Sequence, residues 1–218
     1  MASSEGYEQE TLLMWELYRE CERQFVEFNS LVPYKYNPRY VNSFRLLMLL
    51  QTTCTQIEQL LKLLSKAMLQ DESDANFPVL FKRLNEKKML AVQEVVLYDT
   101  KEILKPFNMM TSKNIPEWWH GNNQTKHHLI NGLYMGTIGE TLNALAALLV
   151  LNRIAEVIPK AGYWNVFDSD QWLRIDSDPD KLTEMIPYFA EYYGKRTSQI
   201  FFHPFIVSTS KNLKHLFD

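Results

Sequence analysis

The sequence predicts a mainly α-helical bundle with a small β-hairpin accessory and an extended C-terminal segment. Apolar residues recur at helical spacing in several long segments, prolines and polar loops separate these segments, and β-branched residues gather in one short stretch. With 218 residues, 46% of them hydrophobic, the chain can bury one sizeable core. We therefore expect a single domain over 1–218, with a helical core over about 5–157 and a C-terminal elaboration over about 158–218.

Two long helices open the chain. The first is predicted from about Glu5 to Asn29, and its buried stripe should hold Met14, Leu17, Tyr18, Cys21, Phe25 and Phe28. Two prolines within 31–40 interrupt the pattern. The second helix is predicted from about Val41 to Leu69, and its buried stripe should hold Phe44, Leu47, Cys54, Ile57, Leu61, Leu64 and Met68.

Two shorter elements follow a loop over 71–76. Residues 77–88 predict a short helix with a solvated basic face. β-branched residues then dominate the stretch before Asp99 and Thr100, and this pattern predicts a small hairpin over about 93–107.

The next helical region is expected in two pieces, over about 116–130 and 138–157. An Asn-Gly pair at 131–132 supplies a stop for the first piece. Thr137 and Glu140 have the spacing of a capping box, which starts the second piece.

The C-terminal elaboration is less regular. Asp178 and Pro179 are suited to the cap and first position of a last helix, which would run to about Tyr193. Residues 198–207 predict a strand or an extended segment packed on the body of the protein.

Net charge, cysteines and hydropathy indicate the partners and the cellular location of the protein. A net charge of −3 argues against a surface that is basic overall, so any nucleic-acid contact would depend on two local clusters: Lys82, Arg83, Lys87 and Lys88, and Lys195 and Arg196. Cys21 and Cys54 lie inside helical patterns, which favours reduced core thiols and a cytoplasmic protein. The first ten residues lack the features of a secretion signal, and the apolar stretch 141–152 is too short to span a bilayer, so no membrane contact is expected.

The stretch PEWWHGNNQTKHH, residues 116–128, carries the candidate chemistry. On a helix, one face would hold Trp119, Asn123, His127 and Ile130, with Lys126 one step around. These groups suit cleavage of RNA without a metal ion. His127 would move the proton, Lys126 would stabilise charge on the phosphate, and Asn123 would orient the substrate.

The same groups could instead satisfy one another inside the bundle. In that interpretation Asn123, Lys126 and His127 pair with Gln51 and Glu58, which lie in an unusually polar part of the second long helix. The four candidate site residues are thus Asn123, Lys126, His127 and Glu58. The paired tryptophans are expected to be a packing anchor rather than a platform for stacking bases.

No cofactor and no metal ion are expected. His127 and His128 are adjacent, so both cannot turn inward from one helix, and no nearby cysteine or carboxylate has the spacing of a zinc site.

The segments WWHGNNQTKHH and GETLNALAALLVL resemble an uncharacterised family of bacterial helical-bundle proteins. Its members carry Trp-Trp, then Asn-x-x-Lys-His, then a helix rich in alanine and leucine. The residues that match this pattern are Trp118, Trp119, Asn123, Lys126, His127 and the run 142–150. The upstream helix over 43–62 is similar to the family's arrangement of serine, leucines, cysteine and an acidic residue.

The wider similarity is to HEPN-type bundles, and it implies a dimer in a bacterial toxin-antitoxin or anti-phage defence system. Some members of that group are metal-independent ribonucleases with an arginine, a spacer of four to six residues and a histidine. This chain departs from that pattern, because the corresponding positions before His127 hold His120, Gly121 and Asn122. Arg196 and His203 have the spacing but not the helical setting.

Two functions from different classes follow. One is an RNA-cleaving or RNA-binding component of a toxin or defence system, with RNA and a partner protein of that system as candidate partners. The other is a non-catalytic interaction or regulatory module in which the Asn-x-x-Lys-His motif is structural. A homodimer is expected in either case, because Ala144, Ala146 and Ala147 allow close approach of helices within or between protomers.

Overall fold

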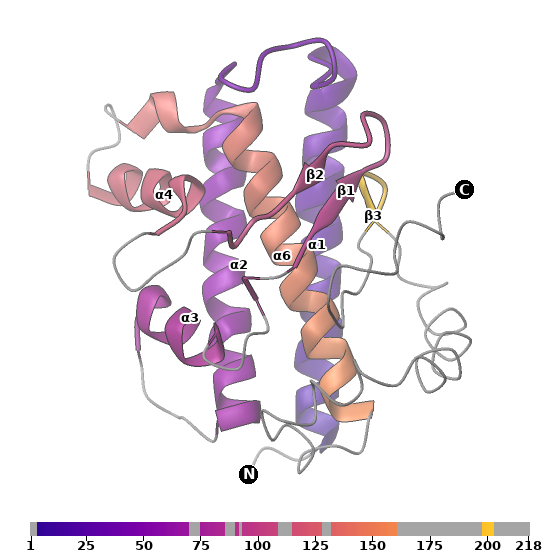
Figure 1. Cartoon of the computed structure of the whole chain (residues 1–218), viewed down its shortest axis with the longest axis vertical. Coiled ribbons are helices and arrows are strands. Elements are labelled where there is room, and N and C mark those ends of the chain that lie inside the picture. Colours follow the sequence, from indigo (N-terminus) through magenta and orange to yellow (C-terminus); the bar gives the residue numbers. More distant parts are fainter. Residues whose placement is uncertain are drawn as a thin grey trace.

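The computed structural model describes residues 4–69, 75–85, 90–91, 93–108, 115–127, 132–160 and 198–202. Five helices pack there as a bundle beside a small antiparallel sheet (Figure 1), which confirms the predicted fold class. The helices are α1 (Ser4–Leu31), α2 (Phe44–Leu69), α3 (Phe77–Asn85), α4 (Glu117–His127) and α6 (Ile138–Lys160), with a 3₁₀ turn, η1 (Leu133–Met135), before α6. The strands are β1 (Val95–Leu97), β2 (Ile103–Leu104) and β3 (Phe201–Phe202).

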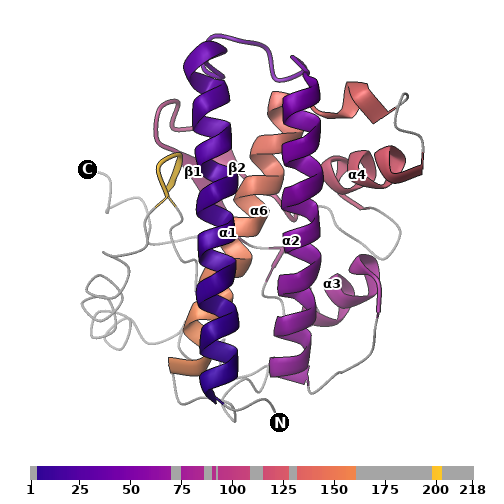
Figure 2. The same ribbon diagram turned by 180° about the vertical axis from the view of Figure 1, so that it is seen from behind.

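Helix α6 packs against both α1 and α2 and forms the centre of the bundle (Figure 2). It begins at the α1–α2 connection, where the Ile138 amide donates to the Val41 carbonyl. Its other end lies beside the start of α1, where the Tyr7 hydroxyl donates to the Ala155 carbonyl at 3.0 Å. Residues 144–152 are all buried, as a helix that is covered on every side requires.

By length and composition alone, α6 could also cross a membrane. The window Ile138–Ala155 is long and apolar enough to span a bilayer, whereas the stretch 141–152 considered in the sequence is too short. In this structure 78% of that window is buried. Such burial is what the central helix of a bundle has.

The predicted stripes of α1 and α2 are confirmed at the described positions other than Leu17 and Phe44, with Met14 partly buried; the side chain of Met68 lies outside the described part of the structure. Leu17 is 37% exposed and Phe44 is 59% exposed, so placing these two side chains in the core was wrong. Besides the predicted Tyr18, α1 buries Trp15 and Glu22, and this orientation turns Leu17 toward solvent.

Helix α2 also starts later than predicted. Asn42 forms a β-bridge with Thr137, so the chain is still extended there. The Ser43 hydroxyl then accepts a hydrogen bond from the Leu46 amide at 3.1 Å, which caps the helix at its first turn. Phe44 is consequently a first-turn residue that points outward.

The predicted hairpin and capping box are confirmed. β1 and β2 pair antiparallel with Val95 opposite Leu104. The Thr137 hydroxyl accepts from the Glu140 amide at 3.1 Å and starts α6. The extended segment predicted at the C-terminus supplies β3, which pairs with the other edge of β1, so the strand order is β2-β1-β3. The predicted helix over 178–193 lies outside the described residues.

Candidate site on helix α4

Two adjacent tryptophans anchor α4. The Trp118 indole donates to the Pro106 carbonyl at 3.0 Å, and its ring meets Phe77 edge-on. The Trp119 ring stacks on Phe77 with centroids 3.9 Å apart. Both indoles are buried, so they act as packing anchors between α4, α3 and the turn after the hairpin.

The buried face of α4 is rotated from the predicted one. Besides the tryptophans, its buried residues are Gly121, Asn122 and Thr125. Asn123 is half-buried, and the exposed residues include His120, Gln124 and Lys126. The predicted face of Trp119, Asn123, His127 and Ile130 is thus buried at Trp119 and half-buried at Asn123, because the buried arc is centred nearer to Trp118. The side chains of His127 and Ile130 lie outside the described part of the structure.

Asn122 is a buried amide that the sequence analysis missed. Its exposed fraction is 0%, and neither side-chain atom has a hydrogen-bond partner in the part of the chain that the structure describes. Asn122 lies four residues after Trp118 and three before Thr125, but Asn123 lies four residues after Trp119, so spacing alone did not single out Asn122. The Thr125 hydroxyl, in contrast, is satisfied by the Gly121 carbonyl at 2.7 Å.

Replacing Asn122 with leucine should raise the free energy of unfolding by about 1 kcal/mol, because it removes a buried amide that has no hydrogen-bond partner among the described residues and keeps the branched shape. Urea unfolding of the full chain measures this change. Asn123→Leu is the matched control, and its half-buried position predicts a change within about 0.5 kcal/mol. A clear loss of stability in Asn122→Leu would contradict the assignment of Asn122 as an unsatisfied group.

Lys126 is exposed, and its ammonium lies 5.7 Å from the centroid of the Trp119 ring. This is the geometry of a cation–π contact at the surface. The side chain is thereby held against the helix while its charge stays in contact with water.

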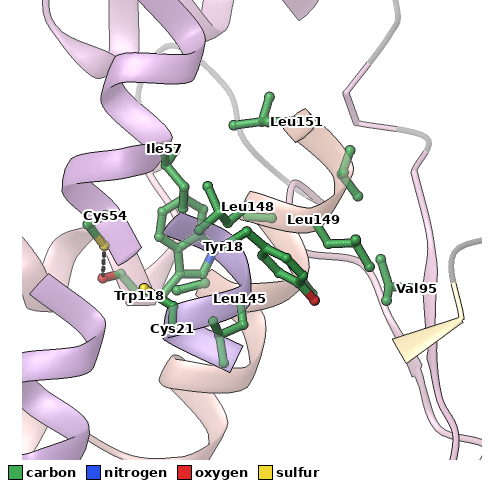
Figure 3. Close-up of a cluster of buried hydrophobic side chains, with 14 of the residues drawn as sticks. Tyr18, Cys21, Cys54, Ile57, Val95, Trp118, Leu145, Leu148, Leu149 and Leu151 are labelled. Atoms are coloured by element: carbon green, nitrogen blue, oxygen red, sulfur yellow. Dashed lines mark hydrogen bonds between the residues drawn. The ribbon is translucent and has the colours of Figure 1, made fainter. Parts of the chain in front are cut away.

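The charges of Lys126 and Glu58 both act on the pKa of the buried Cys54 thiol. Burial raises the pKa of Cys54 well above its ordinary value, the positive charge of Lys126 opposes this rise, and the negative charges of Glu140 and Glu58 add to it. The thiol itself donates to the Trp118 carbonyl at 3.8 Å (Figure 3). Within the described ranges, no hydrogen bond or ion pair joins half-buried Glu58 to Asn123 or Lys126.

The structure describes the side chain of His120 but not that of His127. His127 is the last residue of α4, and its side chain lies outside the described part of the structure. On the exposed side of the helix, the Gln124 amide donates to the His120 ring nitrogen at 2.8 Å. In the portion of the chain with described positions, no group of three or more His, Cys, Asp or Glu residues could hold a metal ion.

Charge is distributed unevenly over the helices. α1 carries seven glutamates and two arginines. α2 and α3 together carry five lysines and arginines and one glutamate, and Lys82 and Arg83 are in the last turn of α3. Both views place α2 between α1 and the pair α3 and α4 (Figures 1 and 2). We call the side of the bundle formed by α2, α3 and α4 the basic flank, because lysine and arginine outnumber glutamate in α2 and α3. One of these residues, Arg45, is ion-paired with Glu27 of α1.

Comparisons with protein-family models, with curated proteins and with solved structures found no match to this chain.

Proposed function

We propose that this chain binds RNA through the basic flank formed by α2, α3 and α4. The observation that carries the proposal is the exposed Lys126, which is held over the Trp119 ring on this flank. RNA is a polyanion, and its affinity for a protein comes largely from lysine and arginine placed against phosphates. A protein of net charge −3 binds it best where basic residues are concentrated, and α2 and α3 carry more lysine and arginine than glutamate, whereas α1 carries more glutamate than arginine.

The resemblance to HEPN-type bundles adds a catalytic role to this proposal. His127 would carry the proton, Lys126 would stabilise the phosphate charge, and Asn123 would orient the RNA. Glu58, whose charge acts on Cys54 as the charge of Lys126 does, would adjust the electrostatic potential near the substrate phosphate. We place the protein in the cytoplasm as a homodimeric component of a bacterial toxin or anti-phage defence system.

Reversing the charge of Lys126 should weaken RNA binding by about tenfold and reduce the salt dependence of the binding constant, because a phosphate contact is lost. The test is fluorescence anisotropy of a labelled single-stranded RNA with full-length Lys126→Glu at several salt concentrations. Lys35→Glu changes the net charge equally but lies in the exposed α1–α2 connection, so its affinity should stay close to that of the wild type. Equal effects of the two substitutions would contradict the proposed surface.

A second candidate function is a non-catalytic interaction or regulatory module. It is favoured by the inward half of α4, where Trp118, Trp119, Asn122 and Thr125 are all committed to the core. In that case the Asn-x-x-Lys-His motif maintains the shape of the bundle and has no chemical role. Absence of RNA binding by the wild type in the anisotropy experiment would favour this candidate.

A further inference from the structure

A buried carboxylate on the α1 side of the bundle receives the C-terminal segment. Glu22 is only 2% exposed. Its Oε1 atom accepts hydrogen bonds from the Tyr18 hydroxyl at 2.9 Å and from the Ser198 hydroxyl. It also accepts from the backbone amides of Gln199 at 3.0 Å and Ile200 at 3.4 Å. Three of its four donors therefore come from a segment that is about 176 positions away in the sequence.

The segment 198–202 is shaped to present these donors. The Ser198 hydroxyl oxygen accepts from the amides of Ile200 at 3.1 Å and Phe201 at 2.9 Å, which folds the segment into a tight turn. On its other side, the Ile200 carbonyl accepts from the Tyr98 amide at 3.0 Å. Ile200 and Phe201 are buried, so the segment closes over part of the core.

The Tyr18 hydroxyl remains a hydrogen-bond donor to the Glu22 carboxylate. Burial raises the pKa of Tyr18 well above its ordinary value, and the negative charge of Glu22 adds to the rise, so the phenol stays protonated and donates. In Figure 3 the Tyr18 hydroxyl points away from Cys54 and Trp118, toward the outer side of the cluster. Arg153 is the nearby cation, and its guanidinium lies 4.9 Å from the Trp15 ring centroid.

The free energy that holds the segment 198–202 in place is the difference between a large desolvation cost and the hydrogen bonds that offset it. Removing the Glu22 carboxylate from water carries a large desolvation cost, which the four donors offset. When the segment leaves, both the carboxylate and its former donors regain water. Within the described residues, the strand contributes Phe201 and Phe202 to the sheet. The net free energy that holds the segment is thus small compared with that of the helical core, and local opening can occur while the core stays folded.

We infer that residues 198–202 form a strap that opens and closes as a unit, with the Glu22 carboxylate as its catch. In the closed state the strap pairs with β1 and covers that edge of the sheet. In the open state the edge of β1 presents unpaired backbone groups, and the surface beneath Ile200 and Phe201 becomes accessible. The strap therefore covers the edge of β1 when it is closed and exposes that edge when it is open.

Hydrogen exchange of the full-length protein, followed by mass spectrometry or NMR, tests the strap. The variants are Glu22→Ala, Glu22→Gln and Ser198→Asp, and Glu20→Ala is the matched control on the exposed side of the same helix. Exchange of the Tyr98 amide should rise about tenfold or more in Glu22→Ala and Ser198→Asp, and less in Glu22→Gln, which keeps a neutral acceptor. Amides of α6 should keep their wild-type exchange, and Glu20→Ala should change neither site.

Two results would overturn the inference. An unchanged Tyr98 amide in Glu22→Ala and Ser198→Asp would mean that Glu22 is not the catch. A parallel rise at Tyr98 and along α6 would mean that the segment is part of the global folding unit rather than a strap. If Glu22→Ala does not fold, Ser198→Asp decides between these results, because its added charge faces Glu22 only while the strap is closed.

Discussion

Replacing Trp118 with alanine should lower the free energy of unfolding by about 3–5 kcal/mol. The indole is 2% exposed and packs edge-on against Phe77 and Phe107. The substitution leaves a large cavity where α4 meets α3 and the turn after the hairpin, and it leaves the Pro106 carbonyl without its donor. Guanidinium unfolding followed by circular dichroism measures the loss.

The control for this prediction lies two residues away on the same helix. His120 is exposed, so His120→Ala should change the free energy of unfolding by less than about 0.5 kcal/mol. A loss below about 1 kcal/mol in Trp118→Ala would mean that the cavity collapses or that α4 is held mainly by other contacts.

The helices were predictable because the information that forms them is local. An apolar side chain every three or four residues marks the buried stripe wherever a helix packs on a bundle, and Tyr18, Phe25, Ile57 and Leu61 lie where this spacing puts them. The start of α2 depends instead on a partner far along the chain. Asn42 is held extended by its bridge to Thr137, and no local pattern reveals that pairing.

The rotation of α4 could not be read from spacing alone. Trp118 and Asn122 are four residues apart, and so are Trp119 and Asn123, so two adjacent faces fit the same pattern equally well. The choice between them depends on the Pro106 carbonyl, which holds the Trp118 indole, and on Phe77, which takes the Trp119 ring. Both partners lie outside the helix.

Glu22 shows a different limit. In a helix with seven glutamates it reads as one more solvated acidic residue, although it lies four residues after Tyr18 and three before Phe25, within the buried stripe. A buried carboxylate is acceptable only with donors, and three of its donors lie in the segment 198–202. The sequence marks the position as buried but does not identify the partner.

Replacing His127 with alanine should reduce RNA cleavage by about 10²–10⁴-fold, the typical contribution of a side chain that transfers a proton in the transition state. The substitution removes the imidazole that follows Lys126 at the end of α4 and leaves the lysine available for phosphate. A time course with labelled RNA in the presence of a metal chelator measures the rate, and a thermal melt of the same samples should show little change.

His120→Ala separates this role from a general need for imidazole on α4. His120 lies on the exposed side of the helix with Gln124, so its loss should leave the cleavage rate unchanged. If wild-type protein binds RNA without cleaving it, the catalytic role of His127 is wrong while the binding surface at Lys126 is retained. If His127→Ala instead loses about 1–3 kcal/mol of stability and no cleavage is seen, the imidazole satisfies a buried partner. Binding, cleavage and stability thus test each residue of the motif separately, because the proposed function gives Lys126 a role in RNA contact and gives His127 a role only in the reaction.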